Sequence, residues 1–530
     1  MSPARDIPLA AAVSAGMNKR LTLTATSGMA AALAFLDPMF YPLAWVAFVP
    51  LLFALRETSL PRAYALGLVA GLVMQAVGSY WLAEFVANLK GYGPLRSASI
   101  AALAWLYGAH LIALPALLFR WVSLRTKLHE LLSWPILLAS AFALLPMPIE
   151  IKLGQTQVQF AHALQGIELT GVYGLDALIA LGNAAMYVLL ARPLRRSDRI
   201  ALAIALVLAA GWFGYGIRAL QNWEERLEGS PTLRVGVVQP NDPPSASIPE
   251  PRAGFAYTYP LELALTEQLA ERGAQIIVWP ESRYRGFFDR QLVRTSFERE
   301  FERIGAPVIF QDMERIDAQP QPAVFNTAAL VANGTLTDRY RKVERIAFGE
   351  YLPAAKTFPI VRDALAAYLG EFFDEVTPGD GPRAFAVGDI TLVPLICYET
   401  TAAPYVARAA AQAKGRALFV ALSNDTWFGT TRAAKQHLYS SILRAVENRT
   451  PLIHAINNGP SGLIDAGGRL RFESRPRKTG GYVAEIPYAE RHGTFFNSNP
   501  RWFVYALSIA LAGLIAIALV RPGQRAASGS

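Results

Sequence analysis

Apolar residues gather in eight long stretches of the chain, seven in the amino-terminal part and one near the carboxyl end. Most of them reach the roughly 17–25 residues that a helix needs to cross the hydrocarbon core of a membrane. The pattern therefore predicts about eight spanning helices, near residues 22–36, 40–55, 64–86, 98–119, 131–149, 170–191, 200–217 and 502–520. The region near 155–165 is expected to be re-entrant or interfacial.

The pattern changes at residue 233, where short β-rich runs begin to alternate with segments of helical periodicity. Strands are predicted at 233–239, 275–279, 307–311, 325–332, 391–397, 417–423, 451–456 and 461–465, with a turn at Asn333-Gly334. Helices are predicted at 261–272, 291–304 and 433–448. This alternation is typical of one α/β layered domain. We expect a transmembrane bundle over 1–221, the α/β domain over 222–500, and a last span with a short tail over 501–530.

Composition and charge agree with a polytopic membrane protein and give its orientation. The chain is 53% hydrophobic and 17% charged. Basic residues of the short loops fall mostly on the side of the amino terminus, and the other side holds only Lys90, Arg96 and Lys152. Because basic loops stay in the cytoplasm, both termini are predicted to be cytoplasmic and the α/β domain extracytoplasmic. The net charge of +9 reflects this topology, so nucleic acid is not expected as a partner.

Three candidate catalytic residues fit the carboxyl ends of strands, where loops expose side chains. Glu281 follows the run Ile276 to Pro280, Lys342 ends the segment Tyr340-Arg341-Lys342, and Cys397 follows Pro394-Leu395-Ile396. A carboxylate, an ammonium and a thiol are the parts of a nucleophilic acyl-transfer site. Cys397 is the only cysteine, so no internal disulfide can form. A lone cysteine is by itself more often inert, so the hypothesis depends on all three residues.

His437 is a further polar candidate, in Gln436-His437-Leu438. No second histidine or cysteine is spaced along the sequence to form a metal site with it. The sequence therefore predicts a structural helix contact for His437, and neither a metal nor a cofactor for the protein.

Five short motifs carry a resemblance to the nitrilase superfamily. In chain order they are Trp279-Pro280-Glu281-Ser282, Phe348-Gly349-Glu350-Tyr351-Leu352-Pro353, Ile396-Cys397-Tyr398-Glu399, Ser423-Asn424-Asp425-Thr426-Trp427-Phe428 and Asn457-Asn458-Gly459. With seven spans before them and one after, the whole chain resembles the apolipoprotein N-acyltransferase family of the bacterial inner membrane. The resemblance implies an αββα sandwich with its active site on the periplasmic side.

The resemblance also implies a role for each motif residue. Glu281 would be the general base, Lys342 would stabilise the tetrahedral oxyanion, and Cys397 would be the nucleophile. Three supporting positions follow in the same way: Glu350 orients Lys342, Tyr398 shapes the site beside the thiol, and Glu399 holds the pocket.

Five further side chains are candidates for the substrate pocket. Three follow the strand at 417–423, and these are Asn424, Trp427 and Phe428. Phe287, with Phe288, is a candidate lid. Phe372 belongs to an apolar stripe of near-helical spacing over 357–376 that could dip into the outer leaflet. Core packing is an equally good interpretation of that stripe.

The reaction implied by the resemblance is a ping-pong acyl transfer. A membrane phospholipid would donate a fatty acyl chain to Cys397 as a thioester, and the amine of a diacylglyceryl-modified apolipoprotein would accept it. Segments 283–285 and 343–347 depart from the family pattern, which leaves a different amine acceptor open. Two further functions stay open: a membrane-bound amidase or lipid hydrolase that passes the acyl group to water, and a non-catalytic scaffold.

Overall fold

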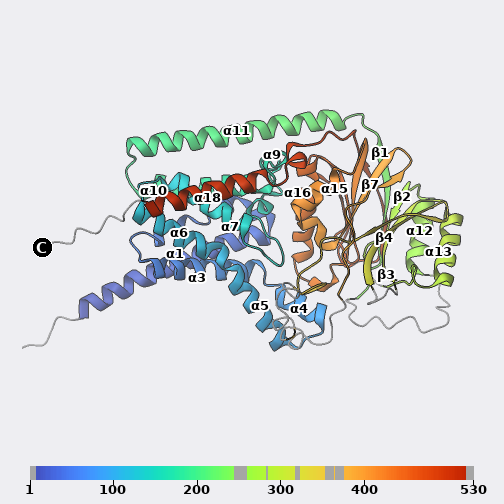
Figure 1. The fold of residues 1–530 in the computed structure, drawn as a ribbon, viewed down its shortest axis with the longest axis horizontal. Coiled ribbons are helices and arrows are strands. Elements are labelled where there is room, and N and C mark those ends of the chain that lie inside the picture. Colours follow the sequence, from blue (N-terminus) through green and yellow to red (C-terminus); the bar gives the residue numbers. More distant parts are fainter. Residues whose placement is uncertain are drawn as a thin grey trace, which may run out of the picture.

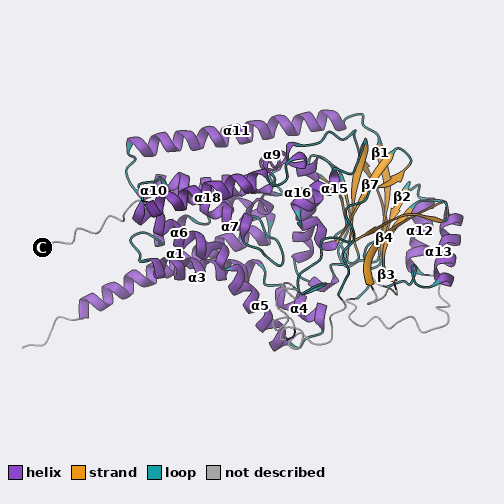
Figure 2. Cartoon of the chain, viewed as in Figure 1, coloured by secondary structure: helices purple, strands orange, loops and turns teal. Residues whose placement is uncertain are grey.

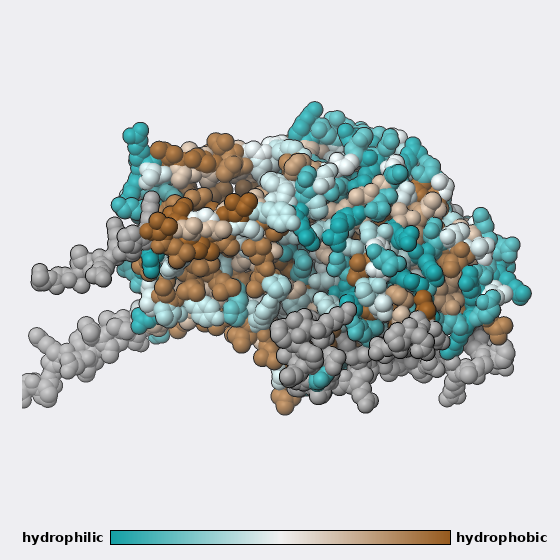
Figure 3. Space-filling view, in the orientation of Figure 1, coloured by the Kyte–Doolittle hydropathy of each residue, from teal (hydrophilic) through white to brown (hydrophobic). Residues whose placement is uncertain are grey.

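The computed structural model describes residues 7–243, 260–281, 284–316, 323–352, 363 and 375–520. A helical part and an α/β part lie side by side along the long axis of the molecule (Figure 1). Helices make up the first part, whereas strands gather in the second, between two pairs of helices (Figure 2). The surface follows the same division, since hydrophobic residues dominate the helical part and hydrophilic ones the α/β part (Figure 3).

The helical part supplies the apolar segments that the sequence predicts. Its longer helices are α1 (Ile7–Leu36), α3 (Leu60–Gly78), α5 (Pro94–Gly108), α6 (His110–Arg125), α7 (Glu130–Leu144), α10 (Val172–Ala191), α11 (Arg196–Leu227) and α18 (Trp502–Val520). Within the described residues, five segments are long and apolar enough to cross a membrane: 60–78, 94–125, 172–191, 196–227 and 502–520. Shorter apolar helices lie at 38–54 and 130–144. The helices fit a polytopic membrane protein.

Two predicted spans differ from the structure. The stretch at 40–55 is not one regular helix, because it consists of the 3₁₀ helix η1 (Pro38–Trp45) and the short α2 (Val49–Ala54). Pro42 lies inside η1 and Pro50 opens α2, and a proline has no N–H for a continuous helix. The stretch at 64–86 is interrupted after Gly78, and a separate helix α4 (Leu82–Lys90) follows. Near 155–165 the chain forms only the short helices η2 (Leu153–Gln157), α8 (Ala161–Leu164) and α9 (Ile167–Thr170) among the described residues.

The α/β part is a four-layer αββα sandwich. Its described residues form two six-stranded sheets, in the orders β12-β1-β2-β3-β4-β5 and β11-β10-β9-β8-β7-β6. The first sheet contains β1 (Thr232–Gln239), β2 (Ile276–Val278), β3 (Val308–Ile316), β4 (Ala323–Ala332), β5 (Thr335–Arg341) and β12 (Gly480–Pro487). The second contains β6 (Phe385–Val387), β7 (Ile390–Ile396), β8 (Arg416–Ser423), β9 (Leu452–Ile456), β10 (Gly462–Ile464) and β11 (Leu470–Glu473).

Helices cover both outer faces of the sandwich (Figure 1). Helices α12 (Leu261–Glu271) and α13 (Gln291–Ile304) lie on one face, and α15 (Ala403–Ala410) and α16 (Ala433–Asn448) lie on the other. Strands β1, β2 and β3 are parallel, as are β7, β8 and β9. The central strands of each sheet are apolar, as expected for parallel strands that are buried on both faces. This arrangement brings the carboxyl ends of β1, β2 and β3 and those of β7, β8 and β9 toward the same region of the sandwich.

The structure confirms the predicted order of elements in this part. All eight predicted strands are present, and α13 and α16 have the bounds expected from the sequence. Strands β5, β6, β11 and β12 were not predicted. Helix α16 lies between the sheets and the helical part, and most of its residues are buried (Figure 1).

Candidate active site

Glu281, Lys342 and Cys397 line one cavity of about 300 Å³. Glu281 follows β2 and forms an isolated parallel bridge with Ile456 at the end of β9, so it reaches from the first sheet to the second. Lys342 follows directly after β5, and Cys397 directly after β7. The structure therefore brings together the three residues that the sequence singles out.

Cys397 lies at a sharp turn between β7 and the 3₁₀ helix η3 (Cys397–Thr401). Its φ of 52° places a non-glycine residue in the left-handed region, a strained conformation that surrounding bonds must hold. The Thr400 hydroxyl donates to the Cys397 carbonyl at 3.1 Å. Burial raises the pKa of the thiol, the Glu281 carboxylate raises it further, and the Lys342 ammonium opposes both. The thiol is therefore a poor nucleophile until a base takes its proton.

Glu281 is a carboxyl group within hydrogen-bonding reach of that thiol. Its Oε1 accepts a hydrogen bond from Asn326 Nδ2 at 2.7 Å. Burial raises the pKa of Glu281, while the nearby ammonium of Lys342 lowers it. A carboxyl group with a raised pKa is a better proton acceptor near neutral pH than an ordinary one. Asn326, in β4, is a site residue that sequence reasoning missed, because no motif surrounds it.

Lys342 is a buried cation, only 1% exposed. Its Nζ donates to Glu350 Oε1 at 2.7 Å, and Glu350 Oε2 accepts from the Ile346 N–H at 3.0 Å. Burial by itself lowers the pKa of Lys342, but Glu350, Cys397 and Glu281 outweigh it and the pKa is raised. The side chain therefore stays an ammonium, and a fixed positive charge beside the thiol can stabilise a developing oxyanion.

The Glu399 side chain links the segment that carries Cys397 to the segment that carries Lys342. Its Oε2 accepts from the Ile396 N–H at 2.7 Å, next to the nucleophile. Its Oε1 accepts from the Val343 N–H at 2.8 Å, next to Lys342, and from the Tyr340 hydroxyl at 2.5 Å. One buried carboxylate thus fixes the loops of both sheets relative to each other.

The cavity has an apolar wall to which both parts of the molecule contribute. Helices α1, α3 and α4 contribute Phe35, Met74, Phe85 and Leu89, with Trp81 just before α4. From the α/β part come the predicted residues Tyr398, Asn424, Trp427 and Phe428. The rings of Phe85 and Phe428 stack with centroids 5.2 Å apart. A long apolar chain can therefore extend from Cys397 toward the helices.

Two predicted pocket residues do not contribute to this wall. Phe287 is fully buried in a separate core, with its ring centroid 5.0 Å from that of Phe310. It lies outside the cavity because its side chain fills the space between α13 and the first sheet. Phe372, with most of the stripe over 357–376, lies outside the described residues.

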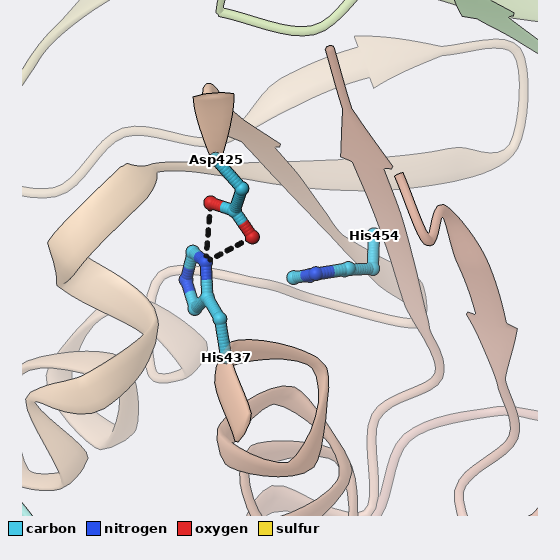
Figure 4. A group of neighbouring side chains, drawn as sticks. All are labelled: Asp425, His437 and His454. Atoms are coloured by element: carbon cyan, nitrogen blue, oxygen red, sulfur yellow. Dashed lines mark hydrogen bonds and ion pairs between the residues drawn. The ribbon is translucent and has the colours of Figure 1, made fainter. Parts of the chain in front are cut away.

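The cavity wall includes polar residues that sequence reasoning did not assign to it, namely Glu150, Asp425 and His437. The sequence shows no second histidine spaced to form a metal site with His437, but the folded chain brings His454 close to it. Asp425, His437 and His454 offer ligand atoms that all lie within 4.8 Å of one another, a possible metal site (Figure 4). Sequence spacing could not reveal this group, because His437 and His454 lie on different elements that meet only in the folded chain.

Comparison with known proteins agrees with the two-part architecture. The family model of the apolipoprotein N-acyltransferase N-terminal domain matches residues 27–185, and that of carbon-nitrogen hydrolase matches residues 234–490. The apolipoprotein N-acyltransferase of Geobacter metallireducens is 30% identical over 513 residues, which are 93% of this chain and 94% of that protein. The apolipoprotein N-acyltransferase of Bdellovibrio bacteriovorus is 27% identical over 87% of this chain and 86% of its own.

Among solved structures, an amidase from Nesterenkonia sp. aligns at 19% identity with a TM-score of 0.34, covering 48% of this chain and 90% of that chain. The similarity to the Geobacter protein extends over nearly the full length of both chains and includes the helical and the α/β part alike. The chain belongs to the apolipoprotein N-acyltransferase family.

Proposed function

We propose that the chain transfers a fatty acyl group from a membrane phospholipid, through a thioester on Cys397, to the N-terminal amine of a diacylglyceryl-modified apolipoprotein. The observation that carries the proposal is the shared cavity. It places a thiol, a carboxylate and an ammonium at the end of an apolar wall built partly from membrane helices. The names of the relatives support the acceptor, an apolipoprotein, and the reaction, N-acylation.

The first half-reaction forms the thioester. Glu281 takes the proton of Cys397, and the thiolate attacks the ester carbonyl of the phospholipid. The oxyanion that develops is stabilised by the ammonium of Lys342, which Glu350 keeps in place at 2.7 Å. When the intermediate collapses, the C–O bond breaks and Glu281 returns the proton to the leaving alkoxide. The lysophospholipid departs.

The second half-reaction forms the amide. The acceptor amine, as a free base, attacks the thioester carbonyl, and the same ammonium stabilises the second oxyanion. Glu281 takes a proton from the nitrogen and passes it to the Cys397 thiolate that leaves as the C–S bond breaks, so that the thiol and the ionised carboxylate are both restored. A thioester is reactive enough toward amines for no other energy source to be needed. Both substrates carry lipid chains, which the apolar wall can accommodate one after the other.

The placement in the membrane follows from the charge of the loops. We propose that residues 1–221 anchor the enzyme, that residues 222–500 perform the chemistry on the periplasmic side of the inner membrane, and that residues 501–530 form the last span and a short cytoplasmic tail. Basic residues concentrated on the side of the amino terminus support this orientation.

The experiment that tests the proposal is the intact mass of the purified protein in phospholipid-containing detergent, beside Cys397→Ala. We expect a fatty-acyl adduct that neutral hydroxylamine removes and that the variant lacks. Adding a peptide with an N-terminal diacylglyceryl-cysteine should clear the adduct and yield a hydroxylamine-stable acyl peptide. Release of free fatty acid without acyl peptide would instead show a hydrolase. Absence of any adduct on wild-type protein that is folded and supplied with phospholipid would contradict the thioester mechanism.

A further inference from the structure

Three side chains behind the nucleophile come from three different elements of the second sheet and its helix. Asp425 follows β8, His437 lies on α16, and His454 lies in β9. His437 Nδ1 is 2.9 Å from Asp425 Oδ1 and 3.2 Å from Oδ2, and the His454 ring points toward this pair (Figure 4). The two imidazole rings meet nearly edge to face, with centroids 5.1 Å apart.

His454 has an unused ring nitrogen. The side chain is 0% exposed, and its Nδ1 makes a hydrogen bond of 3.0 Å with the Ser441 hydroxyl. Its Nε2 is buried and has no hydrogen-bond partner among the residues that the structure describes. In the tautomer in which Nδ1 donates to the Ser441 hydroxyl, Nε2 carries a lone pair that can bind a cation. A buried ring nitrogen without a partner is unusual in a native protein, and a bound cation is one way to satisfy it.

The hydrogen bonds between this cluster and its neighbouring residues are of the kind that metal-binding histidines make. Such a histidine gives one nitrogen to the metal and uses the other to bond a neighbouring group, which fixes the ring. His437 Nε2 lies 2.8 Å from the Thr400 hydroxyl, and His454 Nδ1 lies against Ser441. Asp425 Oδ1 accepts from the Ser423 hydroxyl at 3.1 Å. Each of the three side chains is therefore held in its orientation by a hydrogen bond with a neighbouring hydroxyl group.

We propose that Asp425, His437 and His454 form a Zn²⁺ site beside the catalytic thiol. The ligands would be His437 Nδ1, His454 Nε2 and a carboxylate oxygen of Asp425. Two imidazole nitrogens and one carboxylate are a common zinc set, with bonds of about 2.0–2.2 Å. Ligand atoms within 4.8 Å of one another can surround such an ion after small rotations of the side chains.

An ion can reach the site, and the local charge favours it. Asp425 and His437 line the catalytic cavity, so the fourth coordination position would face that cavity and the ion could enter through it. Binding would replace the contact between His437 Nδ1 and Asp425 and release the proton on that nitrogen. Glu281 lines the same cavity, so a second carboxyl group faces the entering cation.

The ion would also join the elements that hold the nucleophile. The Thr400 hydroxyl that contacts His437 also donates to the carbonyl of Cys397. Fixing His437 between β8 and β9 would therefore stiffen the strained turn that presents the thiol. The site belongs to this chain's own residues and does not depend on which acyl acceptor the enzyme uses.

The test is Zn²⁺ titration of full-length protein in detergent, purified without a histidine tag and stripped with a chelator. Calorimetry should show one Zn²⁺ per chain, and Co²⁺ in its place should give visible absorption bands typical of a tetrahedral site. His454→Asn removes Nε2 but keeps a donor for Ser441, and it should weaken Zn²⁺ binding by about 100-fold or more. The matched control is His492→Asn at an exposed histidine, which should bind as the wild type does.

Two further measurements keep the result unambiguous. Cys397→Ala should retain the Zn²⁺ site, because the thiol is not one of the ligands. Thermal unfolding without metal should be similar for His454→Asn and the wild type, which shows that the variant folds. The proposal is overturned if folded wild-type protein binds no Zn²⁺ at about 100 μM, a concentration far above the dissociation constants of protein zinc sites. It is also overturned if binding survives His454→Asn or is lost in Cys397→Ala.

Discussion

Replacing Glu350 by glutamine removes one negative charge beside Lys342 and leaves the shape of the side chain unchanged. The carboxylate accepts from Lys342 Nζ at 2.7 Å through one oxygen and from the Ile346 N–H at 3.0 Å through the other. In Glu350→Gln the amide oxygen can keep the bond to the ammonium. The ammonium nevertheless stays buried at 1% exposure without its nearest counter-charge.

The size of the effect follows from that burial. Removing one partner of a buried ion pair costs about 3–5 kcal/mol. Glu350 is 15% exposed and Glu281 still acts on the ammonium, so we expect a loss of about 2–4 kcal/mol in the free energy of unfolding. An ammonium drawn toward Glu281 leaves the position where it meets the oxyanion. Loss of one such electrostatic contact lowers the rate by about 10²–10³.

The pH dependence separates a charge effect from a merely structural one. Burial is the main reason that the pKa of Glu281 is raised, and the charge of Glu350 raises it further. In the proposed mechanism acylation needs ionised Glu281, so the rate should fall as pH falls through this pKa. Without the charge of Glu350 the pKa of Glu281 decreases, and the acidic limb of the profile should move to lower pH. A simple loss of folded protein would lower the whole profile without moving this limb.

The assay is the single-turnover rate of acyl-adduct formation, followed by intact mass as a function of pH along the acidic limb of the profile. Thermal unfolding gives the stability of the same samples. Glu375→Gln is the control, because it removes an exposed carboxylate that pairs with Arg345 at 3.4 Å. An acidic limb that stays in place or moves to higher pH in Glu350→Gln would refute the electrostatic reasoning, as would a rate within twofold of the wild type.

Lys342→Met should move the acidic limb in the opposite direction, since the ammonium lowers the pKa of Glu281; a limb displaced to lower pH would contradict this. Gly71→Ala would place a methyl group 2.3 Å from a backbone oxygen of a facing helix, and we expect a loss of about 1–3 kcal/mol, measured by thermal unfolding. Gly513→Ala is its control, because no atom lies within 4 Å of that position, and an equal loss in both variants would exclude helix packing as the cause. Phe428→Ala removes a ring from the apolar wall and should favour longer acyl chains when phospholipids compete; an unchanged product distribution would place the chain elsewhere.

The sequence predicted those elements whose apolar residues have a clear period. Helices α13 and α16 and the central strands of both sheets are of this kind. Strand β5 escaped prediction because its sequence, Thr335–Arg341, is polar and mostly exposed at the edge of the first sheet. The stretch at 40–55 has a spanning composition, but its prolines prevent one regular helix. Hydropathy reports where a segment can reside and does not report whether its backbone is continuous.

The candidate site was predictable only to the extent that its residues stand in motifs or at strand ends. Glu281, Lys342 and Cys397 follow strands, and the structure brings all three to one cavity. Asn326 lies in mid-strand without a motif, and its bond to Glu281 depends on the sheet order, which places β3 between β2 and β4. Phe287 follows the Glu281 motif closely in the chain, yet its side chain turns into a separate core. Proximity of this kind is a property of the folded chain.

Helix α16 explains why the two parts form one site. On its outer side, the Gln436 side chain accepts from the Trp81 indole at 3.0 Å, and Glu447 accepts from the Val172 N–H at the start of α10 at 2.9 Å. On its inner side, His437 reaches the turn of Cys397 through Thr400. A helix on the surface of a soluble sandwich would leave one face in water, whereas α16 is buried on both. The helical part therefore supplies part of the apolar cavity wall and also the surface that holds α16 against the turn of Cys397. It follows that changes in α3 or α4 should alter which chain is accepted, and changes around Glu281 should alter how fast it reacts.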